Sequence, residues 1–282
     1  GDADNLSIKS DLTLTLGYPK LGLYLNKGPT LTDKIEILDI GIPKTSIAES
    51  KINLMTMSWA KSVIPTRPKN AHKGTFGKTL IIGGSKFYSG APYLSAMAAA
   101  RSGVGLVTLA VTSSVQQSVS SLSPIPTYLP LSDFSKDSNH GQNIKMLMDK
   151  ISSFKSILIG PGFGMGLETQ NFLQQFLREG NDLPPTILDA DAINMLNKND
   201  NKTWWSNLPS ETILTPHLAE FSRLTNLSIE KINTDKINIA SNIATKSKTT
   251  IILKGPNTIV AMPKGEIFIS PFANPSLATA GT

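Results

Sequence analysis

From Lys78 onward, short apolar runs recur along the chain, and most of them end in Gly, Pro or Asp. In chain order they read TLIIGG, GLVTLAV, SILIGPG, TILDAD, TILTPH and TIILKG. Runs of this kind are typical of buried strands. Small-residue or amphipathic stretches separate several of them, such as APYLSAMAAARSG and the segment from Glu168 to Arg178. Strands that alternate with helices predict an α/β fold, with a doubly wound, mostly parallel sheet and helices on both faces.

In such sheets ligands bind beyond the carboxyl ends of the strands, so the residues at those ends are candidates for function. After the first run, GGSKFYSGAP places Gly83, Gly84, Ser85 and Gly90 ahead of a helix. Backbone N–H groups and a helix dipole can face an anion there, although a tight strand-to-helix turn explains the same residues. The segment matches neither the dinucleotide fingerprint G-x-G-x-x-G nor the phosphate loop G-x-x-x-x-G-K-[ST]. A hydride-transferring dehydrogenase is therefore disfavoured.

Two further strand ends combine glycines with acidic residues. The GPGFG run includes Gly162 and Gly164, which allow a flat or phosphorylated ligand to approach the backbone closely. The DADAIN run places Asp189 and Asp191 at a strand end, with Asn194 one turn into the next helix. A carboxylate and an amide in this arrangement can face one cleft, or one of the Asp residues can simply cap the helix.

The last two strand ends carry ionisable side chains. In TPHLAEF, Pro216 favours a helix start, and His217 and Glu220 then share the first turn. A Glu there can hold hydrated Mg²⁺ and a His can hydrogen-bond a ligand, whereas a reciprocal helix cap is the structural alternative. In LKG, Lys254 follows a strand, where an ammonium group can meet phosphate oxygens.

Composition excludes several classes of protein. The formal net charge is +6, but only 6% of residues are aromatic and the lysines are scattered, which disfavours nucleic-acid binding. The chain has no Cys, and His72, His140 and His217 lack the close spacing of a zinc site, so Mg²⁺ held by oxygen ligands is the expected metal. Arg101 interrupts the apolar stretch from Ala91 to Val111, and no signal sequence is evident. A cytoplasmic protein without a membrane partner is expected.

The first part of the chain has a different organisation. Two strand-like runs, DLTLTL from Asp11 and KIEILDI from Lys34, flank a Gly- and Pro-containing connection. Two strands cannot bury a core alone, so these runs are expected to belong to a larger unit. Between Pro43 and Pro68 the composition shifts to Ser, Thr, Lys and Pro, as at a domain boundary.

Seven strings, taken in order, resemble the ADP/ATP-dependent NAD(P)H-hydrate dehydratase family, a branch of the ribokinase-like fold, from Arg67 to Thr282. They are HKGTFGKTLIIGGS, YSGAPYLSAMAAARSGVGLVTLAV, IGPGFG, LDADAIN, LTPHLAEFSRL, LKG and LATAGT. The opening GDADNLSIKSDLTLTLGYPKLGLYLNKG and ILDIGIP resemble the last segment of the Rossmann-like NAD(P)H-hydrate epimerase domain, which precedes the dehydratase in many bacterial proteins. The resemblance implies a bifunctional repair enzyme, with a two-strand epimerase remnant at 1–49, a linker at 50–66 and a C-terminally truncated dehydratase domain at 67–282.

The resemblance also implies a reaction. ADP or ATP phosphorylates the ring hydroxyl of the S-form of hydrated NADH or NADPH, and loss of phosphate restores the dihydronicotinamide. This chemistry needs a base, donors for the developing phosphate charge and a cation, expected to be Mg²⁺. The sequence does not choose between ADP and ATP, but bacterial fused relatives suggest ADP, and relatives commonly form homo-oligomers.

Individual roles follow from the same resemblance. The residues expected to contact the hydrate are Ala91, Gly162 and His217, together with Gly164, Asp191 and Asn194 at the strand ends. The residues expected to contact the nucleotide are Lys254, Gly255, Pro256, Asn257, Thr258 and Gly281. The anion hole is expected from Ala280, Gly281 and Thr282. Glu220 is expected near Mg²⁺, by analogy with an N-x-x-E motif of related kinases.

A departure from the family at the end of the sequence limits these expectations. The family motif continues past LATAGT with Gly-Asp, and that Asp is the expected catalytic base, whereas this sequence ends at Thr282. The chain as given is therefore expected to be nearly inactive, and the epimerase segment is expected to have no activity without its upstream region. Two alternatives stay open: another ribokinase-like small-molecule kinase, which would release a stable phosphorylated product, or a non-catalytic nucleotide-binding fragment.

Overall fold

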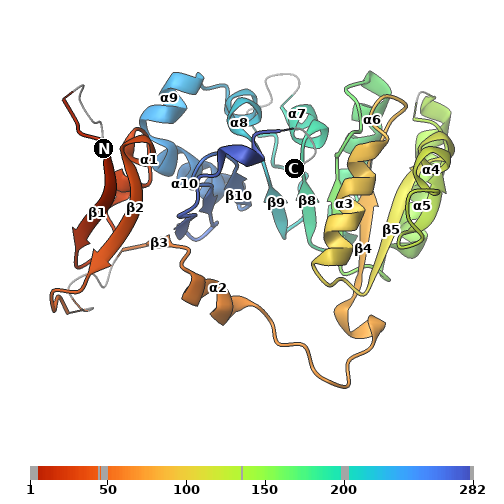
Figure 1. Cartoon of the computed structure of the whole chain (residues 1–282). Coiled ribbons are helices and arrows are strands. Elements are labelled where there is room, and N and C mark those ends of the chain that lie inside the picture. Colours follow the sequence, from red (N-terminus) through yellow and green to blue (C-terminus); the bar gives the residue numbers. More distant parts are fainter. Residues whose placement is uncertain (1–5, 44, 46–49, 135, 198–202, 280–282) are drawn as a thin grey trace.

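The computed structural model of the chain describes residues 6–43, 45, 50–134, 136–197 and 203–279. Within these ranges ten strands form one large sheet (Figure 1). In order across the sheet they are β3 (Ile52–Leu54), β12 (Ile267–Ile269), β11 (Ile259–Ala261), β10 (Thr250–Leu253), β9 (Thr212–Leu214), β8 (Thr186–Leu188), β7 (Ser156–Ile159), β4 (Lys78–Ile82), β5 (Leu106–Thr112) and β6 (Thr127–Leu131).

Neighbouring strands of this sheet run parallel, except that β11 is antiparallel to both β10 and β12. The predicted doubly wound, mostly parallel sheet is therefore confirmed. A parallel pair needs a long crossover connection, which the helices between the strands provide. The carboxyl ends of β4, β7, β8, β9 and β10 consequently share one edge of the sheet.

Helices cover both faces of the sheet. Because side chains alternate along a strand, Ile81 packs with α3 and α4 on one face, while Leu80 and Ile82 belong to the core shared with α5 and α6 on the other. Figure 1 shows α3 across β4 and β5. The helices are α1 (Gly28–Leu31), α2 (Met57–Val63), α3 (Gly90–Arg101), α4 (Ser113–Val119), α5 (His140–Ile151), α6 (Leu167–Leu177), α7 (Asp191–Leu196), α8 (Leu218–Thr225), α9 (Ile229–Thr234) and α10 (Lys236–Ser247).

The two predicted N-terminal strands form a separate pair. β1 (Ser10–Leu16) and β2 (Thr32–Leu38) run parallel and stand on the side of the large sheet that ends with β3 (Figure 1). Leu14 and Leu16 of this pair are each about half exposed, as expected for two strands that cannot bury a core. The connection between the strands is anchored more firmly, because Tyr24 is only 7% exposed and belongs to the main core.

The predicted linker over 50–66 is not a plain connection. β3 extends the large sheet by pairing in parallel with β12, and α2 follows it. The ring centroids of Trp59 in α2 and Phe268 in β12 are 5.2 Å apart. A strand of three residues has no readable periodicity, so composition alone indicated a boundary here. The division of the remaining chain into epimerase and dehydratase domains stays a prediction.

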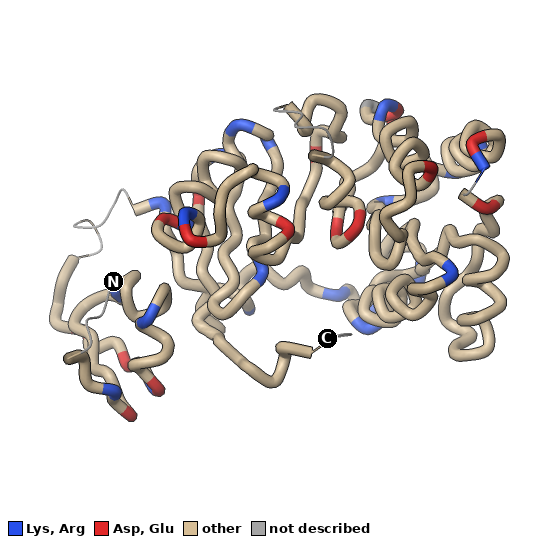
Figure 2. The backbone as a smooth tube through the Cα atoms, turned by 90° about the horizontal axis from the view of Figure 1, so that it is seen from above, with Lys and Arg blue, Asp and Glu red and all other residues tan. Residues whose placement is uncertain are grey.

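Two surface properties complete the fold. Figure 2 shows Lys and Arg, like Asp and Glu, distributed over the molecule instead of gathered on one face. Within the described ranges, none of the helices combines the length and the apolarity that crossing a bilayer requires.

Candidate functional site

The glycine-rich loops after β4 and β7 lie against each other. The backbone N–H of Gly84 donates to the carbonyl of Pro161 at 2.9 Å, and a Cβ on Gly83 would lie 2.5 Å from the same carbonyl oxygen. Gly162 adopts a φ of +67°, and a Cβ there would lie 2.5 Å from the carbonyl oxygen of Tyr88 and 3.1 Å from Cβ of Ala91. Glycine is thus required at these positions, and the structure brings Ala91 and Gly162 together.

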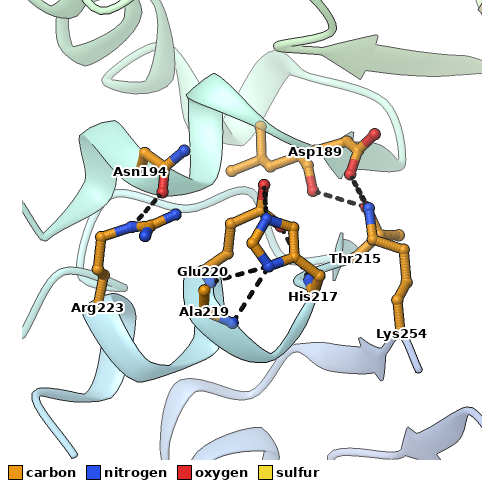
Figure 3. A network of polar contacts seen from close by, with 9 residues as sticks. Asp189, Asn194, Thr215, His217, Ala219, Glu220, Arg223 and Lys254 are labelled. Atoms are coloured by element: carbon orange, nitrogen blue, oxygen red, sulfur yellow. Dashed lines mark hydrogen bonds and ion pairs between the residues drawn. The ribbon is translucent and has the colours of Figure 1, made fainter. Parts of the chain in front are cut away.

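The next strand end holds Gly164 and Asp191 together. The N–H of Gly164 donates to Oδ2 of Asp191, the first residue of α7, at 2.8 Å. Asn194 points elsewhere, because its Oδ1 accepts a 2.9 Å hydrogen bond from Nε of Arg223 in α8 (Figure 3). Asn194 and Arg223 line an open hollow of about 510 Å³. Asp191 and Asn194 therefore contact different neighbours, and their predicted role in binding the hydrate stays a prediction.

Asp189, at the end of β8, contacts side chains that follow the next two strands of the sheet, β9 and β10 (Figure 3). Its Oδ1 accepts hydrogen bonds from Nζ of Lys254 at 2.8 Å and from the hydroxyl of Thr215 at 2.7 Å. Ala190, which follows, has a φ of +51° that non-glycine residues rarely adopt. Strained backbone of this kind gathers at functional sites, which supports this edge as the site.

His217 caps α8. The ring nitrogen Nδ1 of His217 accepts hydrogen bonds from the backbone N–H groups of Ala219 at 3.1 Å and of Glu220 at 3.3 Å. The backbone N–H of His217 in turn donates to Oε2 of Glu220 at 2.8 Å. The reciprocal cap considered from the sequence is therefore present. It leaves the other ring nitrogen, Nε2, 3.2 Å from Oε1 of Glu220, with the imidazole half exposed and the carboxylate buried.

The strand ends of β9 and β10 also join directly. His217 and Lys254 form a parallel bridge, in which the N–H of Lys254 donates to the carbonyl of Pro216 at 2.8 Å. The predicted hydrate contact and the predicted nucleotide contact are thus neighbours. This adjacency is what a reaction between two bound molecules requires.

Of the predicted nucleotide-binding residues, Lys254, Gly255, Pro256 and Asn257 border a cavity of about 200 Å³. Asn257, with a φ of +52°, is buried and donates through Nδ2 to the carbonyl of Ser270 at 2.9 Å. The hydroxyl of Thr258 donates to the carbonyl of Gly255 at 3.1 Å. The cavity is further lined by Leu253, Leu218, Lys236, Ile259 and, from the N-terminal segment, Tyr24, Leu25, Asn26, Pro29 and Thr30.

Three observations at the site concern electrostatics and unused polar atoms. Partial burial lowers the pKa of Lys236, because it disfavours the charged ammonium. The buried hydroxyl of Ser85 and Oδ1 of Asn257 make no hydrogen bond to any described residue. A Cβ on Gly164 would lie 3.6 Å from that hydroxyl. Buried polar atoms without partners are costly, so both positions favour a bound molecule or ordered water.

The expected anion hole falls on Ala280, Gly281 and Thr282, which lie outside the described residues, and so does the expected nucleotide contact of Gly281. A different cluster was not predicted from the sequence. Asp137, His140 and Glu168 each present a ligand atom within 4.8 Å of the others. The i,i+3 spacing of the first two was the only signal, because Glu168 belongs to another helix.

Comparison with solved structures defines the class of this protein. A ribokinase-like superfamily protein from Enterococcus faecalis V583 matches with a TM-score of 0.70 at 26% identity, covering 82% of this chain and 76% of that one. The ADP/ATP-dependent NAD(P)H-hydrate dehydratase of Bacillus subtilis, co-crystallised with ATP/Mg²⁺, matches with a TM-score of 0.66 at 28% identity and the same coverage. The protein therefore has a ribokinase-like α/β fold.

Residues 79–282 match the model of the NAD(P)H-hydrate dehydratase family, and the chain belongs to that family. The ADP-dependent (S)-NAD(P)H-hydrate dehydratase of Neisseria meningitidis serogroup B is 32% identical over 220 residues, 78% of this chain and 70% of the relative. The bifunctional NAD(P)H-hydrate repair enzyme Nnr of Moorella thermoacetica is 33% identical over 277 residues, 98% of this chain. The chain spans about half the length (52%) of that bifunctional relative.

Proposed function

We propose that the chain contributes the site of an ADP- or ATP-dependent dehydratase, which restores NADH and NADPH from the S-form of their hydrates. The observation that carries the proposal is the convergence at one sheet edge of residues from separate strand ends. Gly162 lies against Ala91, and His217 is bridged to Lys254. Both substrates are proposed to bind at this edge, and the adjacency of the two sets suits transfer of a phosphoryl group between them.

On the hydrate side, His217 is prepared to donate a hydrogen bond. Because its Nδ1 accepts two backbone N–H groups, the neutral ring carries its proton on Nε2, next to Oε1 of Glu220. The ring is half exposed, so Nε2–H can turn from Glu220 to an oxygen of the hydrate. The absence of a side chain at Gly162 lets its loop pack closely against Tyr88 and Ala91, which holds the loop at the proposed hydrate side.

On the nucleotide side, Lys254 is held loosely enough to change partners. Its ion pair with Asp189 is partly exposed, at 42% and 29%, and so is a weak interaction in water. A phosphate can replace Asp189 as the partner of the ammonium. The cavity beside Gly255 and Asn257 then accommodates part of the nucleoside.

Mg²⁺ is part of the proposal through Glu220. A single carboxylate is what Mg²⁺ commonly takes from a protein when nucleotide phosphates and waters complete its shell. Oε2 of Glu220 accepts the backbone N–H of His217, whereas Oε1 lies 3.2 Å from the half-exposed imidazole nitrogen Nε2 of His217. Oε1 is thus the atom that fits the ion, which would supply charge neutralisation to the transferring phosphoryl group.

The proposed chemistry has two steps. The ring hydroxyl loses its proton to a base and attacks the terminal phosphorus of the nucleotide, releasing the shortened nucleotide. Phosphate then leaves with the ring oxygen as a neighbouring ring carbon loses a proton, which forms the double bond of the dihydronicotinamide. The expected base is the Asp of a Gly-Asp pair beyond Thr282, and backbone N–H groups around Gly281 are expected to stabilise the phosphate.

The test begins with the coding sequence past Thr282. The protein with its Gly-Asp pair is assayed with hydrated NADH, Mg²⁺ and either ADP or ATP, following the recovery of dihydronicotinamide absorbance. Nucleotide-dependent recovery that vanishes when the Asp is changed to Asn supports the dehydratase and identifies the donor. A phosphorylated alcohol that accumulates instead indicates a small-molecule kinase, and nucleotide binding without turnover indicates a non-catalytic fragment.

Two properties of the whole protein belong to the same proposal. We expect a cytoplasmic homo-oligomer. We also expect no nucleic-acid partner, because the relatives' substrates are small molecules and the charge is scattered. Light scattering on the purified protein checks the assembly, and cell fractionation checks the compartment. A monomer, or a membrane-bound pool, would contradict the corresponding expectation.

A further inference from the structure

A cluster of three potential metal ligands lies outside the proposed catalytic edge. Asp137 belongs to the short 3-10 helix η4 (Asp137–Asn139), His140 begins α5, and Glu168 lies in the first turn of α6. One ligand atom from each lies within 4.8 Å of the others. Among the described residues this is the one such group of three or more His, Cys, Asp and Glu side chains.

The histidine in this cluster is deeply buried and aims an unused nitrogen at the carboxylates. Its side chain is 1% exposed, and Nε2 lies 3.2 Å from the carbonyl oxygen of Phe134. A carbonyl can only accept, so Nε2 carries a proton and donates to it. In the neutral ring Nδ1 then has a lone pair. Nδ1 makes no hydrogen bond to any described residue and lies 3.4 Å from Oδ1 of Asp137.

The two carboxylates add further lone pairs. Oε2 of Glu168 is buried and makes no hydrogen bond to any described residue. One ligand atom of Glu168 lies within 4.8 Å of those of both Asp137 and His140. Nδ1 of His140 and the carboxylate oxygens of Asp137 and Glu168 are therefore three acceptors that face one another. Such an arrangement requires a positively charged species at its centre.

We infer that Asp137, His140 and Glu168 bind a first-row divalent metal ion, with Zn²⁺ as its representative. The mixed set of one imidazole and two carboxylates suits this class better than Mg²⁺ or Ca²⁺, which take oxygen ligands. Ligand atoms about 2.0–2.2 Å from Zn²⁺ stand roughly 3.3–3.6 Å apart in a tetrahedron. The 3.4 Å between Nδ1 and Oδ1 matches that spacing. The hydrogen bond to Phe134 orients the imidazole from behind, as metal-bound histidines require.

The site is distinct from the catalytic edge but connected to it by aromatic packing. The ring of His140 lies 6.0 Å from that of Phe172, and Phe163, between Gly162 and Gly164, lies 5.3 Å from Phe134 and 6.1 Å from Phe172. An ion at the cluster joins the starts of α5 and α6 beneath the loop that carries Gly162. The metal therefore has a structural role, and the inference does not depend on the proposed dehydratase activity.

The experiment measures Zn²⁺ binding to the chelator-treated full chain by isothermal titration calorimetry. The wild type is expected to bind one Zn²⁺, and its melting temperature is expected to rise with Zn²⁺ concentration. Asp137→Asn and Glu168→Gln are each expected to weaken binding by about tenfold or more, at least the cost of losing an outer partner of a metal ligand. Asp137 is 70% exposed, so its variant should fold even if His140→Gln does not.

Two control variants separate this site from other histidines. His72→Gln alters an exposed histidine that lies far from Asp137, His140 and Glu168 in the sequence, and it is expected to leave Zn²⁺ binding unchanged. His217→Gln removes the imidazole beside Glu220, the alternative place for the ion. Loss of binding only in His217→Gln would overturn the inference. The inference is also overturned if the wild type takes up no Zn²⁺, which would mean that a proton is shared among the three groups. Binding of Zn²⁺ by Asp137→Asn and Glu168→Gln as tight as that of the wild type would overturn it as well.

Discussion

The ammonium of Lys254, at the end of β10, lies 2.8 Å from Oδ1 of Asp189, at the end of β8. The strand between them contributes as well, because Thr215 after β9 donates to the same oxygen at 2.7 Å. Three adjacent strand ends are thereby linked at one point of the sheet edge. Since Lys254 is 42% exposed, water and ligands reach the pair.

Lys254→Ala is expected to weaken nucleotide use while leaving the fold intact. Loss of the ammonium removes one partner for phosphate, so the KM for the nucleotide should rise by about tenfold. The pair with Asp189 is solvent-accessible, so the free energy of unfolding should change by less than ~1 kcal/mol. Steady-state kinetics of the protein with its Gly-Asp pair and urea unfolding check both. The exposed Lys264→Ala is the matched control. An unchanged nucleotide KM would contradict the assignment.

His217 has two roles that substitution can separate. His217→Ala removes the N-cap of α8 and is expected to cost about 1 kcal/mol of stability, besides weakening hydrate use. His217→Asn keeps a good capping side chain but lacks the imidazole, so stability should recover while the KM for the hydrate stays high. Thermal melts and kinetics with varied hydrate distinguish the roles. Full recovery of hydrate use in His217→Asn would reduce His217 to a cap.

The sheet and the meeting of its strand ends at one edge were predictable because the signals are local. Short apolar runs ending in Gly, Pro or Asp mark buried strands, and parallel strands place their ends at one edge. The contacts of Gly84 with Pro161 and of Lys254 with Asp189 follow from that geometry. The strand β3 was not predictable, because its pairing with β12 joins residues more than two hundred positions apart.

Side-chain direction was harder to predict than position. Asp191 and Asn194 are three residues apart, yet one meets Gly164 and the other Arg223. A helix rotates successive residues by a fixed angle, but which neighbour each one meets depends on the packing of α7 against the adjoining elements. For the same reason Glu168 gave no sign that it meets His140, since that contact depends on how α5 and α6 pack.

Gly162→Ala is expected to damage both the fold and the site. A methyl group there would lie 2.5 Å from the carbonyl of Tyr88, and the φ of +67° adds strain, so the loss of stability should be about 1–3 kcal/mol or more. The control is Gly141→Ala in α5, where a Cβ meets nothing within 4 Å and helix propensity favours alanine. Urea unfolding of both variants checks the contrast. Equal stability of the two variants would show that the loop accommodates a side chain.

Lys236 gives a prediction about pH. Its partial burial lowers its pKa from 10.5, so below the lowered value both folded and unfolded chains carry the charge and the burial penalty is complete. As the pH rises through the folded pKa, the folded chain releases the proton first, and the stability of the wild type relative to Lys236→Met should rise until about pH 10.5.

A bound nucleotide opposes this release of the Lys236 proton, because its phosphates favour the ammonium, so nucleotide affinity should fall over the same pH range. Urea unfolding and nucleotide titration across this pH range measure both trends, with Lys246→Met, an exposed lysine of the same helix, as the reference. A nucleotide affinity that falls equally in Lys236→Met would remove Lys236 from the nucleotide pocket.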